Sequence, residues 1–314
     1  MTAGAAPVAV VGTGVIGSGW AALLLARGHD VVAHDPGPGA EAALRAAVES
    51  AWPALQQLGL AAGASPDRLV FVDSASEAAD EASFVQESGP ERVNLKQPLL
   101  VELDRAAPPG VPIASSSSGL SASEIQRMCT LHPERVLIGH PFNPAHLIPL
   151  VEVVPGSVTD QLTVDRTLDF YTSLGKRPIL VRQEVPGHVA NRLQAALWRE
   201  AYSLVERGVA TVTDIDTAIA HGPGLRWALL GPLVNQHLSG GAGGMAHVLE
   251  HLGPPAQVWM DDLGEPRLTP ELAAALVDGV DEELRDIDQP QMIAERDALL
   301  IDLLLHKAQQ TSFP

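Results

Sequence analysis

The chain has 314 residues, 46% of them hydrophobic, and its 38 acidic and 20 basic residues give a formal net charge of −18. A surface of this charge repels nucleic acid and anionic membranes, so neither is expected as a partner. Cys129 is the single cysteine, which excludes an internal disulfide and any cysteine-based metal cluster, and the length predicts two domains.

No apolar run reaches the roughly 18 residues that a membrane span needs. The N-terminus, from Met1 to Gly4, enters a predicted strand at once, without a basic region or a signal-peptide cleavage site. A cytoplasmic protein is therefore expected.

The first predicted element is a buried strand over Val8–Val11 that runs into a turn with the spacing G-x-G-x-x-G. In this pattern the first glycine permits a tight turn, the second lets a pyrophosphate approach the backbone, and the third lets the following helix pack closely on the strand. The free N–H groups at the helix N-terminus then face the phosphates. We expect a dinucleotide to be held by Gly12, Gly14, Val15, Ile16 and Gly17.

The second predicted strand supplies an acid that selects the cofactor. After a predicted helix over 16–27, residues 31–33 begin a strand that leads to Asp35. A carboxylate about 20 residues beyond the glycines takes the ribose hydroxyls of NAD, and its charge repels the additional phosphate of NADP. The sequence therefore predicts NAD(H) as the cofactor, the alternative being a glycine-rich turn without a ligand.

Helices and strands continue to alternate up to residue 181. Strands are predicted at 69–72, 83–87, 111–114, 135–139, 150–154 and 177–181, with helices at 40–60, 77–82, 91–105, 121–128 and 158–174. This order predicts an α/β fold with a Rossmann-type, doubly wound and mostly parallel sheet. From Pro186 the pattern is helical only, with helices at 229–238, 245–252, 271–284 and 292–306 divided by proline and glycine. We predict a dinucleotide-binding domain over 1–185 and an all-α domain over 186–314 that contributes to substrate binding and forms a homodimer.

Three polar side chains stand out at or near the ends of these strands. Ser118 and His140 follow predicted strands, and ligands of open α/β sheets bind outside the carboxyl ends of strands. Glu152 lies among aliphatic residues, where a carboxylate is costly to bury unless a cation or a hydrogen-bond donor meets it. His140 is a suitable partner, and a His–Glu pair beside a nicotinamide can remove the proton of a secondary alcohol while hydride leaves the same carbon.

Apolar residues recur at helical spacing from Val189 to Val205 and predict the first helix of the second domain. Asn191, at the start of this helix, is a further candidate. Its amide and the hydroxyl of Ser118 are both suited to hydrogen-bond the substrate oxygen. Structural alternatives are a turn histidine at His140, one serine of a run of four at Ser118, and an asparagine that satisfies local backbone at Asn191. The histidines form no metal-binding spacing with acids, so no metal is predicted.

Together these motifs resemble the 3-hydroxyacyl-CoA dehydrogenase family. The resemblance covers the chain to about residue 240 and rests on the glycine turn, Glu87…Glu91…Lys96, Ser118, Gly139-His140-Pro141-Phe142-Asn143-Pro144, Glu152 and Pro186-Gly187…Asn191-Arg192. It implies that His140 and Glu152 are the catalytic pair and that Ser118 and Asn191 bind the substrate oxygen. It also implies that Glu91 and Lys96 lie near the cofactor, and Ser116 is grouped with the cofactor-binding residues.

Further details resemble one branch of that family, whose members act on free acids. They are Pro141, Gly222-Pro223-Gly224-Leu225-Arg226-Trp227 and Gly240-Gly241-Ala242-Gly243-Gly244-Met245. That branch includes L-carnitine dehydrogenase, L-gulonate 3-dehydrogenase and lambda-crystallin, and polyketide ketoreductases are related to it. Between Pro36 and Leu69, where CoA-dependent members have a helical hairpin with a lysine for the CoA phosphates, the only bases are Arg45 and Arg68.

We therefore expect an NAD(H)-dependent oxidoreductase that interconverts a 3-hydroxy and a 3-oxo group on a small substrate that is not a CoA thioester. A small hydroxy acid and a polyketide-type β-keto acid are the expected classes. L-Carnitine remains open, since its quaternary ammonium would need aromatic faces, which Trp198, Tyr202, Trp227 and Trp259 offer, and Arg226 is suited to hold a carboxylate. A CoA thioester as the substrate also remains open, as does an NAD-binding protein without catalytic activity.

Overall fold

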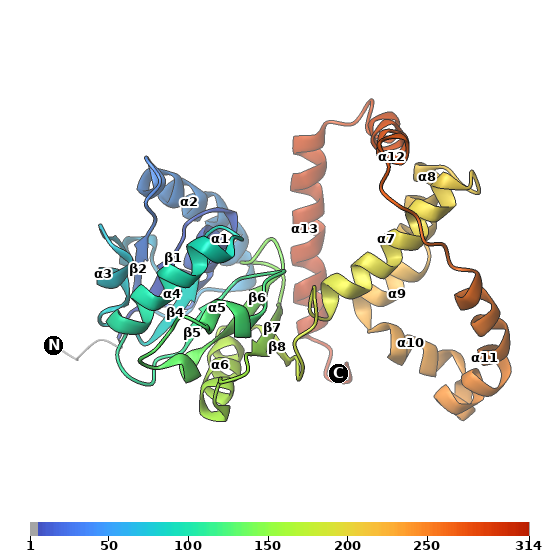
Figure 1. Cartoon of the computed structure of the whole chain (residues 1–314). Coiled ribbons are helices and arrows are strands. Elements are labelled where there is room, and N and C mark those ends of the chain that lie inside the picture. Colours follow the sequence, from blue (N-terminus) through green and yellow to red (C-terminus); the bar gives the residue numbers. More distant parts are fainter. Residues whose placement is uncertain (1–5, 314) are drawn as a thin grey trace. The chain divides into compact units, whose positions relative to one another are not determined.

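The computed structural model describes residues 6–313, so Met1 to Gly4, on which the expectation about the N-terminus rests, lie outside the described residues. The chain divides into two compact units, the first ending at Arg192 and the second beginning at Leu193. Figure 1 shows a sheet flanked by helices in the first unit and helices in the second. The boundary predicted from the sequence lies at 184–186, a few residues before this division.

The first unit is built on an eight-stranded sheet with the strand order β3-β2-β1-β4-β5-β6-β7-β8. Neighbouring strands are parallel throughout, except that β6 and β7 are antiparallel. The predicted doubly wound, mostly parallel sheet is confirmed. The strands are β1 (Val8–Val11), β2 (Val31–His34), β3 (Leu69–Phe71), β4 (Phe84–Glu87), β5 (Ile113–Ser115), β6 (Val136–Pro141), β7 (Leu150–Pro155) and β8 (Arg177–Leu180).

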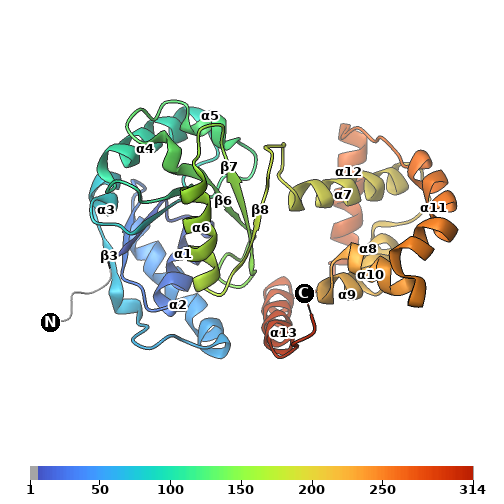
Figure 2. The ribbon, with the colours of Figure 1, turned by 90° about the horizontal axis from the view of Figure 1, so that it is seen from below.

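Helices cover both faces of this sheet and enclose a separate apolar core on each (Figure 2). Successive residues of β1 alternate between the two cores, as the period of a strand requires, with Val8 and Val10 in one and Ala9 and Val11 in the other. One core contains residues of α1 (Val15–Ala26), α2 (Ala40–Leu58) and α6 (Gln161–Ser173). The other contains residues of α3 (Ala75–Ala79), α4 (Val93–Ala106) and α5 (Ala122–Gln126).

The described part of the second unit consists of helices and connections, which confirms the predicted helical C-terminal domain. α7 (Ala190–Glu206) starts within the first unit and continues into the second. It is followed by α8 (Val212–Ala220), α9 (Pro223–Leu229), α10 (Pro232–Ser239), α11 (Gly244–Asp262), α12 (Pro270–Glu283) and α13 (Gln289–Ala308).

Two features of this unit differ from the sequence-based expectation. α8 and α9 are additional helices, and α8 begins with a capping box in which Thr211 and Asp214 each bond the other's backbone N–H. α11 does not end before Pro254 and Pro255 but continues to Asp262. Both prolines are exposed, so water can satisfy the carbonyls that lose their helical partners there.

No helix among residues 6–313 has the length and hydropathy that crossing a membrane requires.

Candidate active site

The glycine turn after β1 forms a cradle that side chains would fill. Gly12 has φ +89°, and a Cβ there would lie 2.6 Å from the backbone nitrogen of Gly89, just beyond β4. A Cβ on Gly17 would lie 1.9 Å from the carbonyl oxygen of Gly12. Gly14, the N-cap of α1, has no atom within 4 Å of its Cβ position. The backbone is thus tightly packed at Gly12 and Gly17, whereas the space next to Gly14 at the helix N-terminus is open. This arrangement fits a pyrophosphate bound at the helix N-terminus.

This cradle lies at the point of the sheet where the strand order reverses. β1 pairs with both β2 and β4, and open α/β sheets bind ligands outside the carboxyl ends of strands at such a point. Asp35 follows β2, and its carboxylate accepts hydrogen bonds from the backbone N–H groups of Thr13 and Gly37, each 2.8 Å long. The structure thus brings the predicted ribose-binding acid against the glycine turn.

The remaining candidates for cofactor binding, Val15, Ile16 and Ser116, lie near the carboxyl ends of β1 and β5. Val15 is 74% exposed at the start of α1, whereas Ile16 packs against the core. Ser116, just after β5, has its Oγ 2.9 Å from both the Gln86 Nε2 and the Ser88 Oγ. Ser116 therefore faces the end of β4, next to the glycine turn.

Lys96 is fully buried and engaged with Glu87 at the end of β4. Its Nζ lies 2.9 Å from both carboxylate oxygens of Glu87 and 3.1 Å from the carbonyl oxygen of Gly89, but 3.9 Å from Glu91. Through these contacts the ammonium group holds the segment between β4 and α4 in place. Glu87 is its direct partner.

Glu91 organises the loop that follows β5. Its Oε1 accepts hydrogen bonds from the Ser117 hydroxyl at 2.6 Å and from the backbone N–H groups of Ser118, Gly119 and Leu120. Burial acts to raise the pKa of Glu91, but these hydrogen bonds and Lys96 outweigh it and lower the pKa below its ordinary value. An ionised Glu91 therefore fixes the backbone that presents Ser118, whose exposed hydroxyl has no hydrogen-bond partner within residues 6–313.

His140 and Glu152 form the buried pair that the sequence predicts. They are directly opposite each other on the antiparallel strands β6 and β7, and His140 Nδ1 lies 2.8 Å from Glu152 Oε2. Glu152 has no exposed surface and His140 is 6% exposed. Because a carboxylate only accepts hydrogen bonds, Nδ1 carries the proton, which leaves the Nε2 lone pair free to act as a base.

The second oxygen of Glu152 binds the first turn of α7. Glu152 Oε1 accepts hydrogen bonds from the backbone N–H groups of Val189 and Ala190, at 2.8 and 2.9 Å. Burial acts to raise the pKa of Glu152, but the hydrogen bonds from His140, Ala190 and Val189 outweigh it and lower the pKa. The structure thus brings Asn191, the next residue of α7, close to the pair, and its half-buried amide bonds neither His140 nor any other group among residues 6–313.

Sequence reasoning missed two residues of this site, Ser117 and His188. His188 is 3% exposed, its Nε2 lies 3.3 Å from the carbonyl oxygen of Ser117, and its ring centroid is 5.4 Å from that of His140. Ser117 cannot be singled out within a run of four serines. The signal for His188 was a polar aromatic side chain directly after the glycine at a helix start.

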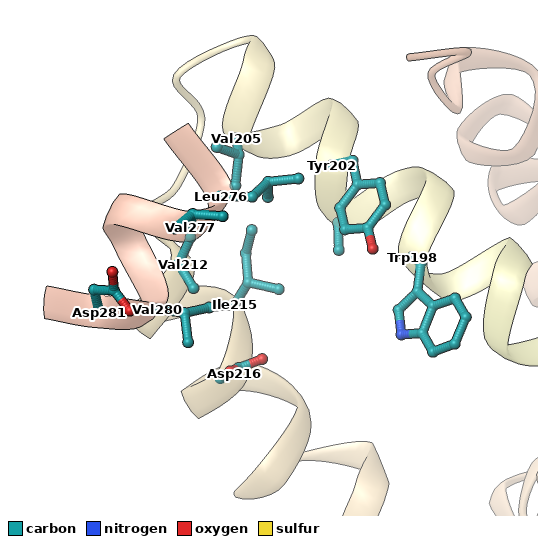
Figure 3. Close-up of a pocket in the computed structure, with 11 residues that line it drawn as sticks. Trp198, Tyr202, Val205, Val212, Ile215, Asp216, Leu276, Val277, Val280 and Asp281 are labelled. Atoms are coloured by element: carbon teal, nitrogen blue, oxygen red, sulfur yellow. The ribbon is translucent and has the colours of Figure 1, made fainter. Parts of the chain in front are cut away.

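The aromatic residues predicted to be available for a cationic substrate do not gather in one place. A cavity of about 450 Å³ opens within the second unit among α7, α8 and α12. Trp198 and Tyr202 of α7 line it together with aliphatic side chains of α8 and α12 (Figure 3). Trp227 and Trp259 do not line this cavity and are 42% and 66% exposed. The exposed Arg226 makes no ion pair among the described residues.

A glycine cradle with an acid beside it and a buried His–Glu pair on the same sheet are the features of an NAD-dependent dehydrogenase. The chain belongs to the 3-hydroxyacyl-CoA dehydrogenase family. Residues 7–185 match the model of that family's NAD-binding domain, and residues 187–278 match the model of its C-terminal domain.

Individual relatives cover nearly the whole chain. It is 51% identical to an L-carnitine dehydrogenase of Streptomyces coelicolor over 297 residues, which are 95% of this chain and 93% of that protein. It is 47% identical over 313 residues to a protein of Gibberella moniliformis named 3-hydroxyacyl-CoA dehydrogenase, covering 97% and 96% of the two chains. The structure of a 5-formyl-3-hydroxy-2-methylpyridine-4-carboxylic acid 5-dehydrogenase, an NAD⁺-dependent dismutase, superposes with a TM-score of 0.83 at 28% identity, covering 97% and 99%.

Proposed function

We propose that this chain interconverts the 3-hydroxy and 3-oxo groups of a small free acid, with L-carnitine as the first substrate to test. The observation that carries the proposal is the His140–Glu152 pair, which is buried and hydrogen-bonded at 2.8 Å on the sheet that holds the glycine cradle. The pair supplies a proton acceptor on the same sheet as the glycine cradle that is suited to bind NAD.

In this proposal the residues have separate roles. Gly12, Gly14, Gly17 and Asp35 hold the cofactor, which accepts hydride from the alcohol carbon when bound. His140 Nε2 takes the hydroxyl proton during oxidation and returns it during reduction, while Glu152 accepts the Nδ1 hydrogen bond and orients the ring. Such a transfer contributes about 10²- to 10⁴-fold to the rate.

The substrate oxygen is held from two sides. Ser118 belongs to the loop that Glu91 fixes, and Asn191 belongs to the turn of α7 that Glu152 fixes. Neither side chain has a hydrogen-bond partner in the described part of the chain, so both are available to a ligand. We assign them to the oxygen that His140 protonates and deprotonates.

Two observations favour a substrate without CoA. Arg45 Nη2 lies 2.8 Å from Glu41, and Arg68 Nη2 lies 3.1 Å from Asp30, so both bases between Pro36 and Leu69 are already paired with carboxylates. Phosphates binding there would have to displace these partners. In addition, several relatives that are 45% to 51% identical over almost the whole chain are named L-carnitine dehydrogenases.

We also propose that the chain is a cytoplasmic homodimer that pairs through its second unit. Large apolar side chains of this unit are exposed, including Leu225 at 60%, Leu233 at 69%, Val258 at 66% and Trp259 at 66%. Monomeric soluble proteins rarely leave such side chains uncovered in numbers. A second copy would cover them by a symmetric contact.

The proposal is tested by following NADH at 340 nm with four substrates: L-carnitine, a small 3-hydroxy acid without the ammonium group, an aromatic β-keto acid and acetoacetyl-CoA. We expect turnover of L-carnitine with NAD and none of acetoacetyl-CoA with NADH. If acetoacetyl-CoA is the best substrate, the free-acid assignment is wrong. The chain would then resemble the Gibberella relative, named 3-hydroxyacyl-CoA dehydrogenase, in its substrate class. A His140→Gln variant is expected to bind NADH and to have lost turnover with every substrate.

A further inference from the structure

His188 carries two unfavourable local features beside the proposed catalytic pair. Its φ of +52° is the only positive φ of a non-glycine residue among those described, and such a conformation is uncommon outside glycine. Its Nδ1 is buried and has no hydrogen-bond partner among residues 6–313, which native structures seldom tolerate. A phenylalanine would fill similar space without an unpaired ring nitrogen, but it could not donate to the Ser117 carbonyl as His188 Nε2 does. A histidine retained under these conditions points to a role other than stability.

The hydrogen bonds around His188 connect two parts of the site. Its Nε2 donates to the carbonyl of Ser117, the residue that Glu91 holds through its hydroxyl. The next two residues, Val189 and Ala190, donate their N–H groups to Glu152. One side chain thus connects the loop that presents Ser118 to the helix start that holds the His140–Glu152 pair.

We propose that His188 is a positioning residue that sets the placement of Ser118 relative to His140 and Glu152. The inference rests on the proposed catalytic function of the pair. His188 acts through its Nε2–H bond to Ser117 and through its ring, which lies 5.4 Å from the His140 ring and is tilted by 53°. With this link in place, the substrate oxygen lies between the Ser118 hydroxyl and the His140 Nε2 when it binds. Small errors in such placement cost large factors in rate.

The electrostatic setting requires that His188 stays uncharged. Burial lowers the pKa of His188; the Ser117 carbonyl, Glu152 and Glu91 act to raise it, and His140 acts to lower it. The net effect is a lowered pKa, so at neutral pH His188 keeps the single Nε2 proton that the Ser117 bond needs. The positive charge that forms during turnover is then confined to His140.

The test compares His188→Phe with His188→Gln. Phenylalanine keeps the ring and removes both nitrogens, whereas glutamine keeps an N–H donor that can reach the Ser117 carbonyl. We expect kcat to fall by about 10- to 100-fold in the phenylalanine variant and to recover in large part in the glutamine variant. NADH affinity is expected to stay at the wild-type value in both, because the glycine cradle is unchanged. His132→Phe, on a half-exposed histidine away from the site, is the control and should keep wild-type kinetics.

Two readouts separate positioning from a structural role. The phenylalanine variant should melt close to the wild-type temperature, because it removes the unpaired Nδ1 but also leaves the buried Ser117 carbonyl without its donor. With substrate deuterated at the reacting carbon, the isotope effect on kcat should rise, because hydride transfer becomes slower relative to product release. A smaller active fraction would instead lower kcat and leave the isotope effect unchanged.

Several outcomes would overturn the inference. One is wild-type kcat in His188→Phe, and another is a loss of kcat with a lowered melting temperature and no change in the isotope effect. A glutamine variant as impaired as phenylalanine would also count against the Ser117 link. His140→Gln, assayed in parallel, separates the two proposals: if it stays active, the proposed catalytic pair is wrong, and if it is inactive while both His188 variants are normal, only the positioning role is wrong.

Discussion

Glu152 shows how much one residue can determine in this site. One of its oxygens fixes the tautomer of His140, and the other accepts the first N–H groups of α7. A carboxylate suits both tasks because it has several lone pairs and a charge that a helix N-terminus stabilises. Removing that charge while keeping the shape therefore tests both tasks together.

We expect Glu152→Gln to lower kcat by about 10²- to 10⁴-fold. If the glutamine oxygen still accepts the hydrogen bonds from the Val189 and Ala190 amides, the glutamine NH₂ group faces His140 Nδ1. Nδ1 then has to accept a hydrogen bond instead of donating one. The proton moves to Nε2, and the base is lost. Steady-state oxidation of the hydroxy acid measures the effect, and titration of NADH fluorescence should give wild-type affinity. Near-normal kcat would mean that His140 does not depend on Glu152.

Asp35 is the residue that we expect to select NAD over NADP. Its charge lies against the glycine turn through the Thr13 and Gly37 amides, where the 2′-phosphate of NADP would approach. Asp35→Asn should lower the preference for NAD over NADP by about tenfold or more, measured as the ratio of the two kcat/KM values. Asp30→Asn, which removes the partner of Arg68, is the matched control. An unchanged ratio would exclude Asp35 as the selecting residue.

Among the elements, the connection between β6 and β7 is held by a buried lysine. The Lys176 ammonium donates to the carbonyls of Ala145 and Ile148 and lies 5.1 Å from the ring centroid of Trp20 in α1. Burial, and secondarily Arg27, lowers the pKa of Lys176 to about 7. The folded protein therefore releases this proton at a lower pH than the unfolded chain does.

This gives a prediction for stability against pH. Between about pH 7 and the ordinary lysine pKa near 10.4, the unfolded chain holds more protons at this position, so the free energy of unfolding should rise with pH in that window. Lys176→Met should flatten the rise, as measured by urea unfolding at pH 7, 8 and 9. Lys307→Met, on a lysine that donates to the Ala228 carbonyl at the surface of the second unit, is the comparison and should keep the slope. Equal slopes in all three proteins would contradict the prediction.

The elements of the first unit were predictable because their signals are local. Glycine spacing, an acid after a strand and a carboxylate inside an apolar run each appear within a few residues, and Asp35, His140 and Glu152 lie where these signals place them. Ser117 and His188 were not predictable, because their link joins residues 71 positions apart. α8 had a readable start in the Thr211–Asp214 capping box, but the helix is short and carries no buried residue.

For the molecule as a whole, the proposed homodimer depends on the second unit. Its apolar side chains are largely exposed, whereas the sheet of the first unit has a closed core on each face. We expect Leu233→Asp to shift the chain from dimer to monomer in light scattering coupled to size-exclusion chromatography, because it places a charge on a face that a partner would bury. Leu162→Asp, on an apolar residue of α6 that is 56% exposed, should leave the mass unchanged. A monomeric wild type would refute the homodimer.

The pairing of β6 with β7 also determines which changes in chain length the site tolerates. Successive side chains on a strand point to opposite faces, so one residue inserted between Leu150 and Glu152 would turn the carboxylate away from His140. An insertion in the connection over 142–149 would leave the two side chains paired. That connection begins with Phe142, whose ring centroid is 5.1 Å from that of His140. Changes in the length of this connection should therefore preserve the proposed acid–base pair, whereas changes within β7 should not.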